Sequence, residues 1–124
     1  MPDDPKVFVI RESRDDTRQL QAMLEKETLR VEAFTSIDHF LQAPKWTEAG
    51  CIVVELDLSG NGGIAHLQKL FAAVITVPVI VVTPRPDTRS CISAVRMGVY
   101  DILDRPLDSQ DCVRSVRRAL DHHL

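Results

Sequence analysis

Short apolar runs alternate with longer, partly polar stretches along this chain of 124 residues. Five of the runs are too short for helices and are rich in residues typical of strands: 6–10, 29–34, 51–54, 79–82 and 100–103. The third and fourth runs are apolar without interruption, which is typical of strands covered on both faces. The pattern therefore predicts five strands, with the third and fourth deeply buried.

Between and after these runs, apolar residues recur at the spacing of amphipathic helices. Ser13, Ser36 and Ser109 stand where helix N-caps are expected. The fourth helix should begin at Asp87 and end at Gly98, a C-cap. Strict alternation of strands and helices implies a parallel sheet with helices on both faces and right-handed crossovers. The sequence shows no internal repeat and no second domain, so we expect a single α/β domain.

Glu55 ends the third apolar run and is followed by Leu56 and then by a turn that contains Gly60, Gly62 and Gly63. The carboxyl end of a buried parallel strand is where open α/β sheets place their ligand sites. Glu55 is therefore the first candidate for a functional residue.

The chain resembles a bacterial response-regulator receiver domain over residues 6–120. The family's acidic pair, phosphoaccepting aspartate, glycine of the following turn, switch Ser/Thr and Lys-Pro pair match, in this order, Arg11 and Glu12, Glu55, Gly63, Thr83, and Arg105 with Pro106. The family's mobile aromatic of the fifth strand falls on Ile102, or on Tyr100 if the alignment is offset.

The resemblance implies a flavodoxin-like (CheY-like), doubly wound sheet of five parallel strands in the order 2-1-3-4-5, with five helices. It also implies a cis peptide bond before Pro106. Residues 1–124 would form one receiver-like domain, either complete or the N-terminal fragment of a longer regulator.

The matched positions depart from the family in a systematic way. One acid has become Arg11, the acceptor aspartate has become Glu55, the lysine has become Arg105 and the proline of the turn has become Ser59. The family's three carboxylates hold Mg²⁺, whereas here only Glu12 and Glu55 are left as metal ligands. A unit charge ~5 Å from the metal changes its energy by roughly 3 kcal/mol at an effective dielectric constant of ~20. We therefore expect a weak or absent Mg²⁺ site, and no other cofactor.

Two interpretations of these substitutions are open. In the first, Arg11 pairs with Glu12 or Glu55, Arg105 forks onto Glu55, and the longer carboxylate reaches toward Thr83, so that the domain is fixed in one state. In the second, Glu55 is a solvated carboxylate, Arg11 a surface cation and Thr83 a cap of the loop.

Asp57 offers a further alternative. It lies two residues beyond Glu55, so it would share the face of Glu55 if the strand continued. A carboxylate at the rim of the pocket is the favoured interpretation of Asp57, and a displaced phosphoacceptor is the other.

The leading functional hypothesis is an atypical receiver that signals without phosphorylation, through contact with a protein partner or an attached output domain. The alternative is a working phosphoacceptor that uses Glu55 or Asp57 with a histidine kinase. No Ser or Cys nucleophile has a matched His, so we expect no enzyme activity. A homodimer through the fourth helix, fifth strand and fifth helix is a further hypothesis. The last helix also carries a cluster of arginines, which is either a solvated face or part of a partner surface: Arg114, Arg117 and Arg118.

The composition, 44% apolar and 27% charged, is that of a folded domain. A net charge of −3 gives no reason to expect binding to nucleic acid or to an anionic membrane. The apolar stretch 70–82 is too short to span a bilayer. Cys51, Cys91 and Cys112 share no metal-ligand spacing, so we interpret them as small core residues of a cytoplasmic protein.

Overall fold

The computed structural model describes residues 6–11, 18–27, 29–43, 49–59, 62–73, 76–84 and 86–123. Strands and helices alternate throughout these ranges. The strands are β1 (Lys6–Arg11), β2 (Arg30–Phe34), β3 (Ala49–Glu55), β4 (Val79–Thr83) and β5 (Asp101–Asp104). The helices are α1 (Arg18–Glu25), α2 (Ile37–Gln42), α3 (Gly63–Ala72), α4 (Thr88–Met97) and α5 (Ser109–His123).

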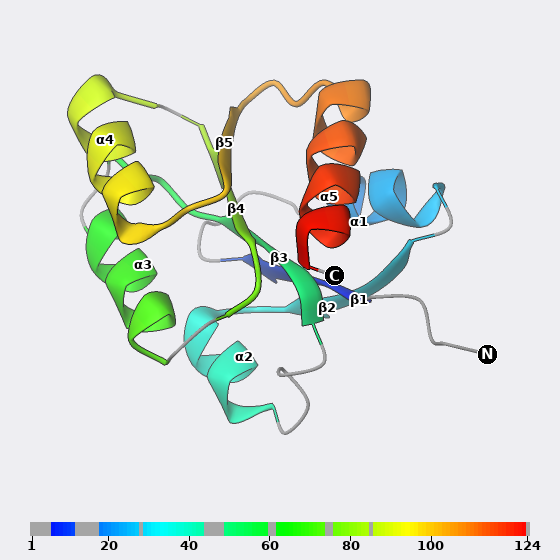
Figure 1. The fold of residues 1–124 in the computed structure, drawn as a ribbon, viewed down its shortest axis with the longest axis horizontal. Coiled ribbons are helices and arrows are strands. Elements are labelled where there is room, and N and C mark those ends of the chain that lie inside the picture. The colour runs from blue at the N-terminus through cyan, green and yellow to red at the C-terminus, as the bar shows by residue number, and fades with distance from the viewer. Residues whose placement is uncertain are drawn as a thin grey trace.

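The strands form one parallel sheet in the order β2-β1-β3-β4-β5, with β3 at its centre (Figure 1). This order and the five helices confirm the fold predicted from the sequence. Because every strand runs in the same direction, the carboxyl ends of β1, β3 and β4 meet at one edge. At that edge Arg11 on β1 lies opposite Glu55 on β3.

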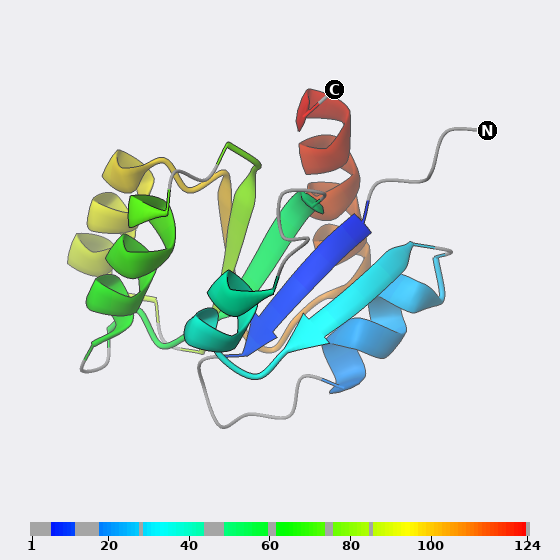
Figure 2. The same cartoon turned by 90° about the horizontal axis from the view of Figure 1, so that it is seen from below.

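The helices cover the two faces of the sheet unequally (Figures 1 and 2). On one face α2, α3 and α4 enclose a core that includes Phe8, Phe40 and Leu67. On the other face α1 and α5 enclose a second core that includes Val53 and Val116. Successive residues of a strand point to opposite faces, so a strand buried on both sides must be apolar at every position. The uninterrupted apolar runs at 51–54 and 79–82 have this cause.

Three of the expected helix ends are confirmed. The Ser36 side chain accepts a hydrogen bond from the backbone N–H of His39 at 2.9 Å, and the Asp87 side chain accepts one from the N–H of Ser90 at 2.9 Å. Helix α4 ends at Gly98, whose φ of 110° lies in the left-handed region that favours glycine.

The expected cap of the last helix is wrong by one residue. Asp108, and not Ser109, accepts the hydrogen bond from the N–H of Asp111 at 3.0 Å, and Ser109 is the first residue of α5. A carboxylate at this place also meets the positive end of the helix dipole, which favours aspartate over serine. The proposed cap at Ser13 lies outside the described residues.

All five strands differ from the predicted ranges by one or two residues at one end or both, and the differences in β3 and β5 concern candidate site residues. Strand β3 begins at Ala49 and includes Glu55 as its last residue, so Glu55 has the position and orientation of a strand residue. Strand β5 begins at Asp101, and the N–H of Tyr100 just before it donates to the carbonyl of Val79 at 2.7 Å.

Candidate functional site

Glu55 is a buried carboxylate at the carboxyl edge of the sheet. It lies opposite Arg11 on one side and Val82 on the other. By the alternation of β3, its side chain shares the face of Cys51 and Val53, which is the face covered by α1 and α5. Only 1% of Glu55 is exposed. The interpretation of Glu55 as a solvated strand-end carboxylate is therefore wrong.

Arg105 forms the ion pair with Glu55. It follows β5, and its Nη2 donates a hydrogen bond to Oε2 of Glu55. Strand β4 lies between β3 and β5, so the long arginine side chain reaches across one strand to make this contact. The Arg105 side chain is 23% exposed. Burial strengthens such a charged hydrogen bond and also makes the loss of one partner costly.

Arg11 does not take the same role. Within the ranges that the structure describes, no ion pair joins Arg11 to a carboxylate, although the register sets it directly across from Glu55. Arg11 is half-buried. Its second predicted partner, Glu12, lies outside the described residues. Among the described residues, Arg105 is thus the cation paired with Glu55, while Arg11 adds positive charge beside the pair.

Thr83 is fully buried at the end of β4, and its side chain holds the loop that follows β3. Its Oγ1 accepts a hydrogen bond from the backbone N–H of Leu58 at 3.1 Å. The N–H of Leu56 donates to the carbonyl of Val82 at 3.1 Å and fastens the same loop to β4. This is the contact expected of a residue that caps the loop, and the role of Thr83 as a switch stays a prediction.

Asp57 lies in the loop beyond β3 and not in a continuation of the strand. Its Oδ1 accepts hydrogen bonds from the backbone N–H of Ser59 at 3.1 Å and from the Ser59 hydroxyl at 2.9 Å. An Asp followed two residues later by Ser is a common turn signature, in which the side chain bonds the nearby backbone. That signal was present in the sequence, where we considered Ser59 only as the residue that replaces a proline.

Close packing at Gly63 explains why the glycine stands at the same distance along the chain from Glu55 as the family's glycine does from its acceptor. A Cβ on Gly63 would lie 2.0 Å from the backbone carbonyl oxygen of Asp57, so the first turn of α3 packs directly on the loop. No residue with a side chain fits there without moving the backbone. The absence of a side chain at Gly63 therefore lets the first turn of α3 pack against the loop that carries Asp57.

Cys112 on helix α5 lies near Glu55, in the core between α5 and the sheet. Burial, and to a lesser degree the charge of Glu55, raises the pKa of the Cys112 thiol to about 11. Burial, and then the neighbouring Cys112, raises the pKa of Cys51 to about 12. Both thiols are protonated at neutral pH, so they are inert core residues. The Ser115 hydroxyl, which donates to Asp101 at 2.6 Å, ties α5 to β5 nearby. The sequence indicates Cys51 and Cys112 as core residues, whereas nothing in their spacing indicates that Cys112 lies beside Glu55.

The remaining predicted positions are placed as follows. The peptide bond between Arg105 and Pro106 is cis, as expected. Ile102 lies opposite Val81 and packs against the core under α4, whereas Tyr100 packs against the core under α5. Ile102 is thus the residue directed toward α4 and Tyr100 is not, while the switching role of either residue stays a prediction.

Comparison with known proteins gives a consistent result. The family model for the response regulator receiver domain matches residues 7–117. The transcriptional regulatory protein FixJ of Azorhizobium caulinodans is 32% identical over 97% of this chain and 57% of its own length. The C4-dicarboxylate transport transcriptional regulatory protein DctD of Rhizobium meliloti is 30% identical over 93% of this chain and 25% of its own length. The chain therefore spans between a quarter and three fifths of these relatives.

Solved structures agree on the fold. A response regulator receiver protein from Pseudoalteromonas atlantica superposes with a TM-score of 0.82 at 20% identity, covering 97% of this chain and all of that one. The structure of FixJ-N gives a TM-score of 0.80 at 22% identity, covering 98% and 97%. Among the described residues, no helix is long and apolar enough to cross a membrane.

Proposed function

This chain belongs to the response-regulator receiver domain family of two-component signalling. We propose that, within this family, it signals without being phosphorylated. In this proposal the domain keeps one conformation and acts through contact with other proteins. One observation carries the proposal. The residue at the phosphoacceptor position, Glu55, is buried and is already ion-paired with Arg105.

Phosphoryl transfer requires an oxygen of the acceptor in line with the phosphorus of the donor. Glu55 is 1% exposed, and its Oε2 is engaged by the Arg105 guanidinium. Its side chain is also one methylene longer than an aspartate. A shift of the reacting atom by ~1 Å can lower a rate on the order of 100-fold. Attack by Glu55 would therefore require the ion pair to break and the carboxylate to move.

The described residues are also a poor set of ligands for Mg²⁺. This ion takes near-octahedral oxygen ligands and retains several waters. Glu55 is neutralised by Arg105, Arg11 brings a further positive charge to the same edge, and Asp57 is turned to Ser59. No group of three or more acidic, His or Cys residues suited to a metal occurs within the described ranges. In our proposal the Arg105 guanidinium supplies the positive charge beside Glu55 that a metal would otherwise supply.

The direct test is to incubate the protein with Mg²⁺ and acetyl phosphate and to measure its intact mass. We expect no stoichiometric adduct of about 80 Da, the mass of one phosphoryl group. The matched control is the triple variant Arg11→Asp/Glu55→Asp/Arg105→Lys, which restores the family's residues at the three positions. The control should gain the adduct if the fold is otherwise competent.

An adduct on the unaltered protein would overturn the proposal in favour of a working phosphoacceptor. Two further variants would then identify the acceptor. Loss of the adduct in Glu55→Gln would assign it to Glu55, and loss in Asp57→Asn would assign it to Asp57. If the proposal is correct, neither of these variants nor the unaltered protein carries an adduct.

The partner contacts proposed from the sequence find partial support on α4. Ile92 is 47% exposed and Val95 is 60% exposed, and both line a groove of about 550 Å³. A dimer through α4, β5 and α5 would cover these two residues. The FixJ and DctD relatives are transcriptional regulatory proteins longer than this chain, so we further propose that the domain controls an output domain of that class.

A further inference from the structure

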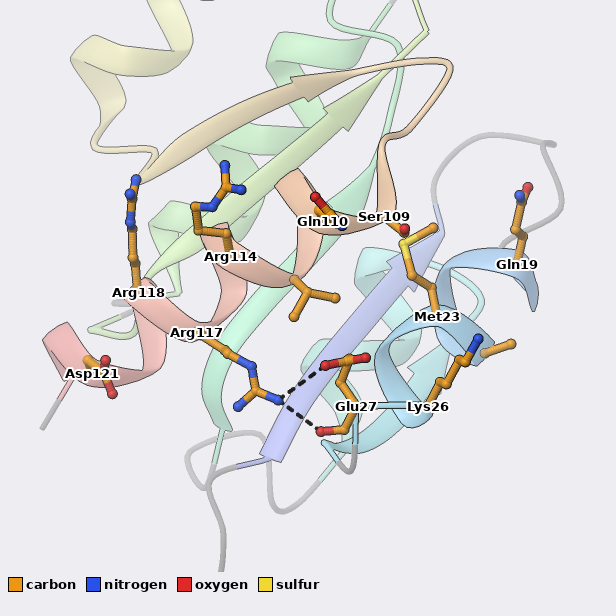
Figure 3. Close-up of a pocket in the computed structure, with 12 residues that line it drawn as sticks. Gln19, Met23, Lys26, Glu27, Ser109, Gln110, Arg114, Arg117, Arg118 and Asp121 are labelled. Carbon is orange, nitrogen blue, oxygen red and sulfur yellow. Dashed lines mark hydrogen bonds and ion pairs between the residues drawn. The ribbon is translucent and has the colours of Figure 1, made fainter.

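A second groove lies between α1 and α5 (Figure 3). These two helices cover the face of the sheet opposite α4 (Figure 2). The volume of the groove is about 800 Å³. Ala22 and Met23 from α1 and Val113 from α5 give it an apolar floor. Ala22 is exposed, while Met23 and Val113 are half-buried against the core below. The groove therefore leaves apolar surface of two neighbouring helices open to a ligand.

The walls of the groove are positively charged. Four cations line it (Lys26, Arg114, Arg117 and Arg118) together with two carboxylates (Glu27 and Asp121), an excess of two positive charges. The whole chain carries a net charge of −3, so this positive surface is local and opposite in sign to the rest of the molecule. Such a surface attracts an acidic partner and repels a basic one.

The four cations differ in how far they are already engaged. Figure 3 shows Arg117 reaching across the groove to the turn after α1, where its Nη2 donates to the carbonyl of Glu27 at 3.0 Å and lies 3.7 Å from Oε1 of Glu27. Arg114 pairs with Asp111 of its own helix at 3.1 Å. For Lys26 and Arg118 the described part of the chain offers no ion pair. Arg117 thus joins α5 to the turn after α1, while Lys26 and Arg118 are exposed to an incoming ligand.

We propose that the groove between α1 and α5 binds an acidic amphipathic helix of a protein partner. An apolar stripe of that helix would cover Ala22, Met23 and Val113, and its Glu and Asp residues would meet Lys26 and Arg118. Binding of an amphipathic helix in an apolar groove is a common mode of recognition. The inference deepens the proposed function, because it names the kind of partner that a domain acting by protein contact would have.

The shape and charge of the groove argue against other ligands. By contrast, the groove on α4 is lined by one carboxylate, Asp87, and one cation, Arg96, so its net charge favours neither an acidic nor a basic partner. Nucleic acid and anionic membranes are bound through many phosphate contacts, which an excess of two charges on a net acidic chain does not provide. An acidic helix fits both the apolar floor and the limited charge.

The test uses a display library of helical peptides with a fixed leucine stripe, in which the flanking positions vary among Glu, Lys and Ser. Peptides are selected on the unaltered protein, and their affinities are measured by fluorescence anisotropy. We expect Glu to be enriched over Lys. We expect Lys26→Glu/Arg118→Glu to weaken binding roughly tenfold or more, because two exposed ion pairs with the peptide are lost and the reversed charges add repulsion.

Two further variants separate groove binding from general charge attraction. Arg89→Glu/Arg96→Glu makes the same change of charge on α4, outside the groove, and should leave the affinity within about twofold. Ala22→Arg fills the floor and adds a positive charge. It should weaken binding if the apolar floor is used, and strengthen it if charge alone attracts the peptide.

The proposal is overturned if the selected peptides carry no excess of Glu, or if Lys26→Glu/Arg118→Glu and the α4 control lose affinity equally. Stronger binding by Ala22→Arg would also overturn it. So would self-association that is lost in Lys26→Glu/Arg118→Glu, or binding of the unaltered protein to anionic vesicles in preference to the peptides. The phosphodonor experiment on the same protein is independent, so a failure of either proposal can be recognised separately.

Discussion

Removal of the Arg105 guanidinium tests whether the ion pair with Glu55 is the central feature of this site. The substitution Arg105→Met retains the length of the apolar side-chain stem and deletes the charge. It leaves Glu55 buried without the cation that now faces it. The unfolded chain hydrates the same carboxylate fully, so the loss falls on the folded state.

The structure sets the expected size of the effect. Breaking a buried ion pair by removal of one partner costs about 3–5 kcal/mol. Arg105 is 23% exposed and solvent screens its side of the pair, so we take the lower end of that range. A loss of about 3 kcal/mol in a domain of this size lowers the melting temperature by roughly 10 °C.

The assay is urea unfolding of four proteins: unaltered, Arg105→Met, Glu55→Gln, and the double variant. Glu55→Gln leaves Arg105 able to turn toward water, so it should cost only about 1 kcal/mol. The double variant should be more stable than Arg105→Met alone, since the neutral amide no longer needs the cation. We expect a coupling free energy of at least about 1.5 kcal/mol.

Additive effects of the two substitutions would refute this reasoning. So would an Arg105→Met protein as stable as the unaltered one, because Glu55 would then be neutralised by another group. Arg105→Lys supplies a check within the same series. It keeps the charge but loses the geometry of the guanidinium, and should therefore fall between Arg105→Met and the unaltered protein.

Three further predictions concern other parts of the molecule. Gly63→Ala should lower the unfolding free energy by about 3 kcal/mol, measured in urea, because its Cβ would lie 2.0 Å from a backbone oxygen. The unfolding free energy should fall as the pH rises above 9, because buried Cys51 and Cys112 stay protonated to pKa values of about 12 and 11 while the unfolded thiols ionise near 9. The variant Cys51→Ala/Cys112→Ala should lack this loss, which amounts to at most about 1.4 kcal/mol per pH unit and thiol. Ile92→Asp/Val95→Asp should abolish any dimer seen by sedimentation velocity and leave a monomeric protein monomeric; a dimer that persists would place its interface away from α4.

The fold was predictable because few arrangements satisfy its pattern. Apolar runs such as 51–54 fit a strand only if both faces of the sheet are covered, and strict alternation with helices then requires parallel strands. The error at the start of α5 is of a different kind. Asp108 and Ser109 are adjacent and both suit a cap, and the choice depends on about one residue of helix phase that the apolar pattern does not set.

The sequence predicted which residues gather at the site better than it predicted which of them contact each other. Strand order brings Glu55, Thr83 and Arg105 to one edge whatever their side chains do. The direction and length of the side chains decide which cation pairs with Glu55. Arg11 lies directly opposite Glu55 on the neighbouring strand, and yet Arg105 makes the ion pair. Such a choice depends on a few ångströms of side-chain geometry, which spacing along a chain does not encode.

The substitutions at this edge are best understood together. A glutamate in place of the acceptor aspartate extends the carboxylate toward β5, and an arginine in place of the lysine extends the cation toward β3, so the two longer side chains meet across β4. Either change alone would leave a buried charge poorly matched, which is costly. Together they form a buried, charge-balanced pair at the phosphoacceptor position, and in our proposal this pair stands where a phosphoryl group and a metal would otherwise be.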